Sequence, residues 1–124
     1  MKKTILVVED FESIRNFVRE TLEKKGYATI GAADGNEAFE VIKEHAVNLV
    51  LSDYNMPNCT GLELLHKIKA NSATSAIPVI FLTTESDPGK MKSAKEAGLS
   101  AWVRKPYKAE LFFAQIENII SNGQ

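Results

Sequence analysis

The chain has 124 residues, of which 44% are hydrophobic and 25% are charged, and its formal net charge is −1. This length predicts one domain over residues 1–124, large enough to bury roughly two-thirds of its unfolded surface without a disulfide or a structural metal. The near-neutral charge provides no broad attraction to nucleic acid or anionic membranes, and no apolar run approaches the roughly 18 residues of a membrane-spanning helix. The single cysteine, Cys59, and the lack of a signal-peptide pattern favour a cytoplasmic protein.

Five short β-rich segments recur along the chain, separated by longer segments with a helical pattern. Three of the five are apolar throughout, which is typical of strands covered on both faces, as in a parallel sheet. The segment ATIGA is weaker and is expected at an edge. The expected strands are Ile5–Val8, Ala28–Ala32, Leu49–Leu51, Val79–Leu82 and Ala101–Val103.

The helical patterns lie between these strands. Apolar spacing of three and four residues predicts a first helix, with Gly26 as its C-cap, and a second helix for which Asp34 and Glu37 could cap the start. The residues that mark the first helix are Ile14, Phe17, Val18, Thr21 and Leu22, and those that mark the second are Phe39, Ile42 and Ala46.

Three more helices complete the alternation. Thr60 and Glu63 stand at the spacing of a capping box, which predicts a helix over 62–69. The remaining helices are expected from Asp87-Pro88 to near Gly98 and over 111–120. Five alternations of strand and helix predict an open α/β fold, with a parallel sheet covered by helices on both faces.

Polar side chains follow four of the five expected strands. Because the carboxyl ends of parallel strands meet at one edge of a sheet, where open α/β proteins bind ligands, we expect these side chains to lie together. The four polar segments are Glu9-Asp10, Ser52-Asp53, Thr83-Thr84 and Arg104-Lys105-Pro106.

These residue types suit one kind of chemistry. Three clustered carboxylates repel one another unless a cation is present, and oxygen ligands favour Mg²⁺. Lys105 and a threonine hydroxyl suit phosphate oxygens, and Asp53 is the natural nucleophile for an acyl phosphate. Taken singly, Asp10 and Thr84 are equally compatible with helix caps or turns, but the four strand ends together favour a site for a phosphoryl group.

The chain resembles the receiver domains of bacterial response regulators, most closely the stand-alone chemotaxis type, CheY. The resemblance covers essentially the whole chain, through ILVVED, DYNMPNCTGLELL, VIFLTTE and AWVRKPY. It implies a flavodoxin-like, doubly wound sheet of five parallel strands in the order 2-1-3-4-5, with five helices. It also implies a signalling domain rather than an enzyme.

The resemblance implies a reaction and a cofactor. A partner histidine kinase would pass a phosphoryl group to Asp53. Mg²⁺ would be held by Asp10, Asp53 and the backbone carbonyl of Asn55, with Glu9 acting through water. Lys105 would pair with the phosphoryl group, and the Lys105–Pro106 bond would be cis.

The resemblance further implies a switch. Thr83 would bond the phosphoryl group, and Trp102, at the position of an aromatic switch residue, would alter the face formed by the fourth helix, fifth strand and fifth helix. That face would bind a downstream protein. The flagellar motor is one candidate, and another pathway or a phosphorelay is the alternative. Asn55 and Glu85 would set the lifetime of the phosphoryl group and imply rapid self-dephosphorylation.

Three positions depart from the usual pattern of the family. Glu9 stands where Asp is most frequent, Thr84 where a small residue is common, and Trp102 is larger than the usual Tyr or Phe. Glu9 bears on the length of the metal contact, and Thr84 bears on access to the phosphoryl group. The size of Trp102 bears on whether its ring can rotate inward.

Other functions explain the sequence less well. An aspartate-nucleophile phosphohydrolase needs a second acid where Asn55 stands. A binding module that has lost phosphorylation would lack an essential residue, whereas Asp10, Asp53, Thr83 and Lys105 are all present. No basic recognition helix for DNA is evident. His45 and His66 lie on the polar sides of helix patterns and are not expected to bind metal or to take part in catalysis. A solvated helix face is expected for Lys90, Lys92 and Lys95, with attraction of an acidic partner segment as the alternative.

Overall fold

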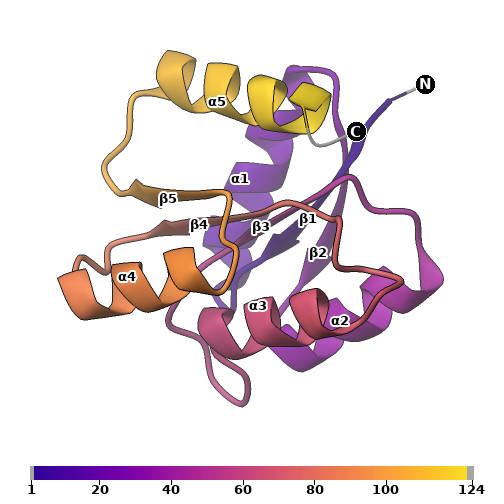
Figure 1. Ribbon diagram of the computed structural model, residues 1–124. Helices are drawn as coiled ribbons and strands as arrows, with labels where there is room; N and C mark the ends of the chain where they lie inside the picture. The colour runs from indigo at the N-terminus through magenta and orange to yellow at the C-terminus, as the bar shows by residue number, and fades with distance from the viewer. Residues whose placement is uncertain (1, 123–124) are drawn as a thin grey trace.

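The computed structural model describes residues 2–122, so that Met1, Gly123 and Gln124 of the predicted domain lie outside the described residues. Strands and helices alternate along the chain, as the sequence predicts (Figure 1). In order they are β1 (Thr4–Val8), α1 (Glu12–Lys24), β2 (Ala28–Ala32), α2 (Gly35–Glu44), β3 (Leu49–Ser52), α3 (Gly61–Ala70), β4 (Val79–Thr83), α4 (Pro88–Glu96), β5 (Ala101–Arg104) and α5 (Ala109–Asn122).

The sheet has five parallel strands in the order β2-β1-β3-β4-β5, which confirms the predicted topology and places β2 at an edge. Val8 at the end of β1 pairs with Ser52 on β3, and Ser52 in turn pairs with Phe81 on β4. The strands therefore end nearly level, and the residues that follow them share one edge of the sheet.

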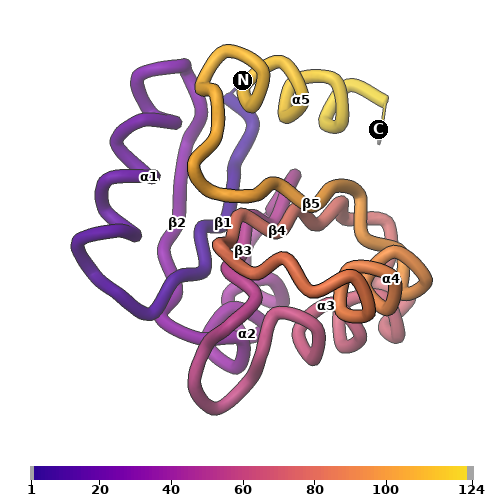
Figure 2. The backbone as a smooth tube through the Cα atoms, turned by 90° about the vertical axis from the view of Figure 1, so that its left-hand side faces the viewer, coloured from indigo at the N-terminus to yellow at the C-terminus, as the bar shows by residue number. Residues whose placement is uncertain are grey.

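Helices cover both faces of the sheet. In Figure 2, α1 and α5 lie on one side of the sheet and α2, α3 and α4 on the other. Each side has its own buried cluster. Val18, Leu22 and Ile116 pack over Ile5 and neighbouring strand residues on the first side. On the second side, helix residues such as Ala38 and Leu65 pack over strand residues such as Val50 and Phe81.

The helix starts follow local chemistry that the sequence predicts. The Asp34 carboxylate accepts a hydrogen bond from the backbone N–H of Glu37 at 2.9 Å, which caps α2. Thr60 and Glu63 form both halves of a capping box at α3. Asp87 caps α4 by accepting from the backbone N–H of Lys90, with proline in the first turn. Such caps supply partners for the N–H groups that a helix start leaves free.

The first helix is present where the apolar spacing predicts it, but its stripe is buried only in part. Val18 and Leu22 are buried, whereas Ile14 is 38% and Phe17 63% exposed. The physical reason is that the stripe has a packing partner only in its later turns, where Val18 and Leu22 contact the cluster beneath α5.

The single cysteine lies inside the fold rather than in an open loop. Cys59 is 2% exposed, and a Cβ on Gly35 would stand 2.5 Å from its sulfur. The start of α2 therefore approaches the loop before α3 as closely as a glycine permits. Burial raises the pKa of the Cys59 thiol above its usual value. Across residues 2–122, every helix is too short or too polar to cross a bilayer.

Candidate functional site

Three carboxylates converge at the carboxyl edge of the sheet. Glu9 and Asp10 follow β1, Asp53 follows β3, and one oxygen from each lies within 4.8 Å of the others. The neighbouring strand positions these groups, because the backbone N–H of Asp53 donates to the carbonyl of Val8 at 3.0 Å. The predicted convergence of the three side chains is therefore present in the structure.

The three acids form a cluster that could hold a metal ion. Glu9 is only 4% exposed. Asp10 Oδ1 is buried and has no hydrogen-bond partner among the described residues. A buried carboxylate oxygen without a partner is costly, so this atom fits a site that supplies a cation. Burial is the main reason that the pKa of Glu9 is raised to about 7, and the proximity of Asp53 contributes to the same shift.

The alternative role of Asp10 as a helix cap does not match the structure. Helix α1 begins after Phe11, and no side chain caps it. Glu9, rather than Asp10, makes the hydrogen bonds that fix the chain between β1 and α1. Its Oε1 accepts from the backbone N–H of Phe11 at 3.2 Å, and its carbonyl accepts from Arg15 Nη1 at 2.7 Å. Asp10 is thus left facing the acidic cluster.

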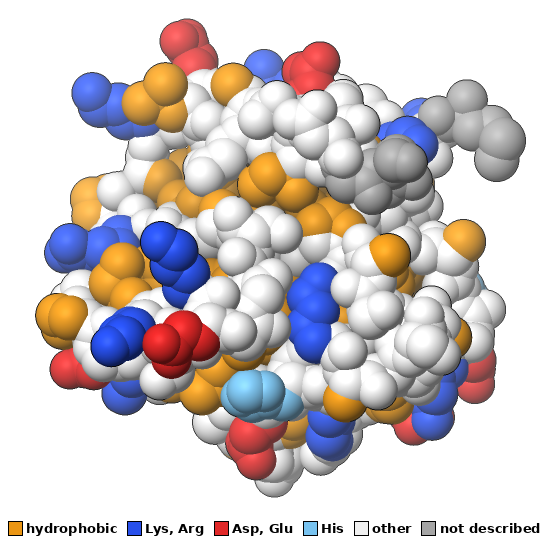
Figure 3. Space-filling model, viewed as in Figure 1, with side chains coloured by type: hydrophobic (Ala, Val, Ile, Leu, Met, Phe, Trp, Pro, Cys, Tyr) orange, Lys and Arg blue, Asp and Glu red, His pale blue; other side chains and the backbone are white. Residues whose placement is uncertain are grey.

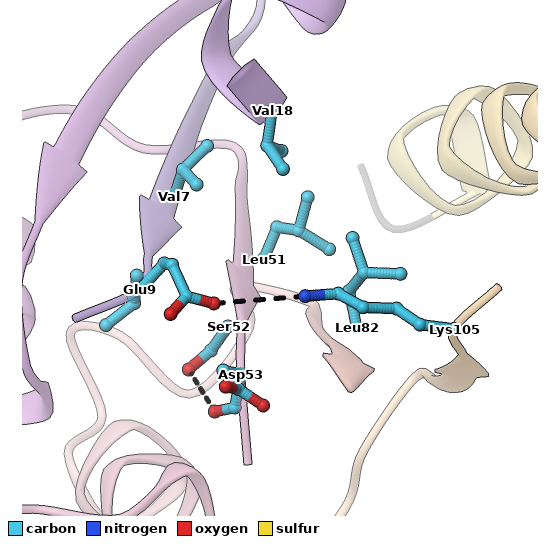
Figure 4. Close-up of a pocket in the computed structure, with 9 residues that line it drawn as sticks. Val7, Glu9, Val18, Leu51, Ser52, Asp53, Leu82 and Lys105 are labelled. Carbon is cyan, nitrogen blue, oxygen red and sulfur yellow. Dashed lines mark hydrogen bonds and ion pairs between the residues drawn. The ribbon is translucent and has the colours of Figure 1, made fainter. Parts of the chain in front are cut away.

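Lys105 brings a positive charge to the same edge. Its Nζ lies 4.0 Å from Glu9 Oε2, and the Lys105–Pro106 peptide bond is cis, as the resemblance implies. Figure 4 shows the lysine side chain extending toward Glu9, with Asp53 below the line that joins them. Apolar side chains, including Leu51 and Leu82, line the small cavity behind these groups.

The backbone around Asp53 is held by short hydrogen bonds. Asp53 Oδ1 accepts from the backbone N–H of Tyr54 at 2.7 Å, and its backbone carbonyl accepts from the Ser52 hydroxyl at 2.8 Å (Figure 4). The contribution of Ser52 was not predicted, although its position directly before Asp53 at a strand end is a signal for it. The backbone of the chain therefore orients the Asp53 carboxylate through Oδ1.

Thr83 is the last residue of β4, and Glu85 follows two residues later, at the next position along the edge. Thr83 is buried, and its Oγ1 accepts from the backbone N–H of Glu85 at 3.2 Å. Thr84 is exposed, and α4 is capped by Asp87, so Thr84 is not a helix cap. The Thr83 hydroxyl keeps its own proton free for another acceptor.

Asn55 and Glu85 contact each other across the edge. Asn55 Nδ2 donates to Glu85 Oε1 at 3.4 Å, and Lys90 Nζ lies 2.9 Å from the same oxygen. The Lys90 and Asn55 hydrogen bonds are the main reasons that the pKa of Glu85 is lowered to about 2. Lys90 is exposed on α4, as expected for a solvated helix face, and in addition it pairs with Glu85. His45 and His66 are exposed as well.

Trp102 on β5 is half-buried within an aromatic group. Its ring centroid lies 5.3 Å from that of Tyr54 and 5.5 Å from that of Phe81. Its indole N–H donates to the backbone carbonyl of Glu85 at 3.1 Å. Beside it, Met91, Lys92, Lys95 and Leu99 line a hollow between α4 and β5. Figure 3 shows basic and hydrophobic side chains mixed over this part of the surface.

Comparisons with known proteins agree with this geometry. The family model of the response regulator receiver domain matches residues 5–117. The chemotaxis protein CheY homolog of Campylobacter jejuni is 30% identical over 121 residues, covering 96% of this chain and 93% of that protein. The crystal structure of Vibrio cholerae chemotaxis protein CheY4 superposes with a TM-score of 0.89 at 33% identity, covering 96% of this chain and 99% of that one.

A second relative is much longer. Histidine kinase P4 of Formosa agariphila is 36% identical over 121 residues, which are 98% of this chain but 9% of the kinase. Sequences similar to this chain therefore make up nearly all of a short chemotaxis protein and a small part of a long histidine kinase. The family match, the CheY-like relatives and the sheet order together show that the chain belongs to the response regulator receiver domains of two-component signalling.

Proposed function

We propose that the chain accepts a phosphoryl group from a histidine kinase on Asp53. The observation that carries this proposal is the acidic cluster of Glu9, Asp10 and Asp53 with Lys105 beside it. This set pairs a nucleophile with a cation that stabilises phosphoryl charge and with acids that could hold a metal ion. In the step, a carboxylate oxygen of Asp53 forms a bond to phosphorus. The nitrogen–phosphorus bond of the donor phosphohistidine breaks, and the released imidazole takes a proton.

The side chains around Asp53 have separate tasks in this proposal. Lys105 pairs with an oxygen of the incoming phosphoryl group, and the Thr83 hydroxyl donates to another. The hydrogen bond from the Tyr54 backbone N–H to Asp53 Oδ1 orients the carboxylate so that Oδ2 attacks. The apolar cavity wall behind Lys105 holds the ammonium group near the edge of the sheet.

Mg²⁺ fits the donor set at this edge. Asp10, Asp53 and the backbone carbonyl of Asn55 would hold the ion, with Glu9 acting through water. Asp10 Oδ1 already lies buried, without a hydrogen-bond partner within residues 2–122. These are oxygen ligands, which Mg²⁺ prefers. When bound, the ion neutralises charge on the carboxylates and on the transferred phosphoryl group.

The output is proposed to lie on the face formed by α4, β5 and α5. Thr83 and Trp102 are joined through residue Glu85, so a change at the site can reach this face. A downstream protein in the cytoplasm would bind there. The similarity to the Campylobacter chemotaxis protein favours chemotaxis, with the flagellar motor as one candidate target, whereas the similarity to the Formosa kinase favours a phosphorelay.

The test is direct phosphorylation. The protein is incubated with acetyl phosphate and Mg²⁺, and its intact mass is measured. We expect a gain of one phosphoryl group that requires Mg²⁺ and that Asp53→Asn abolishes. No gain in the wild-type protein would overturn the proposal in favour of a binding module, and turnover of p-nitrophenyl phosphate would favour a phosphohydrolase.

The lifetime of the phosphoryl group on Asp53 tests the proposed role of Asn55 and Glu85. Asn55 and Glu85 are proposed to permit rapid self-dephosphorylation, and they contact each other at 3.4 Å. The mass gain should therefore decay soon after acetyl phosphate is removed. A phosphoryl half-life of hours would contradict this part of the proposal.

A further inference from the structure

Glu85 is the most highly bonded residue of the loop between β4 and α4. Its backbone N–H donates to Thr83 Oγ1, and its backbone carbonyl accepts from Trp102 Nε1. Its carboxylate Oε1 accepts from Lys90 and Asn55, and Oε2 accepts from the backbone N–H groups of residues 86 and 87. One residue therefore links the site, the aromatic group and the start of α4.

Lys90 is placed to hold this carboxylate. Its backbone N–H donates to Asp87 Oδ2 at 3.0 Å, which fixes it in the first turn of α4. Its ammonium group lies 2.9 Å from Glu85 Oε1 and 5.5 Å from the ring centroid of Tyr54. A cation over an aromatic face is attracted by the ring, so Tyr54 favours the same placement of Lys90.

We propose that Lys90 is a positioning residue that holds Glu85 in its resting place and so restrains both Thr83 and Trp102. Any movement of Thr83 toward a phosphoryl group must either carry the backbone of Glu85 with it or break the bond between them. Lys90 opposes that movement through the side chain of the same residue. The inference rests on the proposed function, since it concerns how readily Asp53 modification changes the rest of the domain.

The solvent exposure of the ion pair between Lys90 and Glu85 sets how strongly it can restrain the loop. The Lys90 side chain is 44% exposed, and ion pairs this exposed contribute little. Loss of the pair should shift the balance between the resting and the phosphoryl-bound arrangements by about two- to fivefold. Because a ligand of the second arrangement binds in proportion to its population, its apparent affinity should rise by the same factor.

The experiment compares Lys90→Ala with Lys95→Ala and Lys90→Arg. Lys95→Ala removes the same charge from the same helix and borders the hollow beside Trp102, but Lys95 makes no ion pair among the described residues. Lys90→Arg keeps a cation that can pair with Glu85. Thermal melting followed by circular dichroism establishes that each variant is folded.

Two readouts are used, and both depend on Trp102, the only tryptophan of the chain. The first is hydrogen exchange of its indole N–H, measured by NMR in the unmodified protein. The second is the concentration of beryllium fluoride, with Mg²⁺ present, that gives half of the change in tryptophan fluorescence. In Lys90→Ala we expect faster indole exchange and about a two- to fivefold lower half-saturating concentration. Lys95→Ala and Lys90→Arg should match the wild-type protein.

The outcomes separate this inference from the proposed function. If indole exchange in Lys90→Ala equals that of the wild-type protein, the restraint does not exist, whatever happens at Asp53. If Lys95→Ala gives the same changes as Lys90→Ala, the effect is one of charge on α4 and the inference is overturned. If the wild-type protein does not respond to beryllium fluoride, the proposed function fails, and the indole exchange still decides the role of Lys90.

Discussion

The ammonium group of Lys105 lies 4.0 Å from the carboxylate of Glu9, although their strands are separated by two others in the sheet. The two residues follow β5 and β1, and Asp53 follows β3 between them. Any group bound to Asp53 is therefore flanked by a cation on one side and by acidic side chains on the other.

We predict that Lys105→Met slows phosphorylation by acetyl phosphate at least about tenfold, because a charged hydrogen bond to the phosphoryl group contributes roughly 1.5–3 kcal/mol. The rate is measured from the intact mass as a function of time. Lys92→Met is the matched control, since Lys92 lies on the exposed surface of α4. Equal rates for Lys105→Met and the wild-type protein would exclude a contact between Lys105 and the phosphoryl group.

Asp10→Asn should change stability in opposite directions with and without Mg²⁺. In EDTA, we expect the free energy of unfolding to rise by about 1 kcal/mol, because one of three clustered like charges is removed. In Mg²⁺, the variant should lose stabilisation that the wild-type protein gains by binding the ion. Urea unfolding in both buffers measures the effect. A variant that is less stable than the wild-type protein in EDTA would show that Asp10 is not under repulsion.

Gly61→Ala should disturb the Asp53 loop. A Cβ at this position would lie 2.6 Å from the carbonyl oxygen of Asp53 and 2.9 Å from Cα of Tyr54, and neither backbone atom can yield cheaply. We expect a loss of about 1–3 kcal/mol in the free energy of unfolding, the usual cost of overpacking, and slower phosphorylation.

Gly89→Ala is the control for that variant. Its added Cβ would meet only a side-chain oxygen of Asp87, at 3.2 Å. We therefore expect its stability to stay within about 1 kcal/mol of the wild-type value, since alanine also favours a helix. If the two alanine variants were equally stable, the close approach of Gly61 to Asp53 would not be a constraint.

The cap of α2 should make stability depend on pH. The hydrogen bond from the Glu37 backbone N–H is the main reason that the pKa of Asp34 is lowered below its usual 3.8. A carboxyl group with a lowered pKa in the folded state adds stability above its unfolded pKa and loses it as the pH falls through the folded value. Asp34→Asn keeps an acceptor for the same N–H but has no charge.

We therefore expect the wild-type protein to exceed Asp34→Asn by about 0.3–1 kcal/mol near neutral pH, the usual value of a charge at a helix start. The difference should vanish in acid, below the folded pKa of Asp34. Urea unfolding of both proteins across this range provides the measurement. A difference that is constant with pH would assign the effect to shape rather than charge.

The sequence predicts the sheet and its polar edge because both depend on local patterns. Runs such as Leu49–Leu51 identify buried strands, and the first polar residue after each run marks the edge where Asp53 and Lys105 lie. The strand Ala28–Ala32 has the predicted bounds and the predicted edge position. Register and strand order then bring the side chains together without further information.

Two features lie beyond such patterns. Helical spacing places Phe17 on the same stripe as Val18, but it does not say which turns have another element to pack against. The contact between Glu85 and Lys90 spans the start of α4, where the five-residue separation matches no helical pair. Only the path of the loop after β4 brings these two side chains together.

The close contact between Gly35 and Cys59 makes the accessibility of the Cys59 thiol a measure of local unfolding where the start of α2 meets the loop before α3. The thiol is 2% exposed and is shielded by the start of α2, so a labelling reagent can reach it only when this corner separates. Because the chain has no other cysteine, the rate of thiol labelling reports only how often the start of α2 separates from the Cys59 loop. Cys59 lies in the loop that follows Asp53. If a bound ligand orders this loop, the Cys59 thiol should be labelled more slowly, and no other probe is needed in the chain.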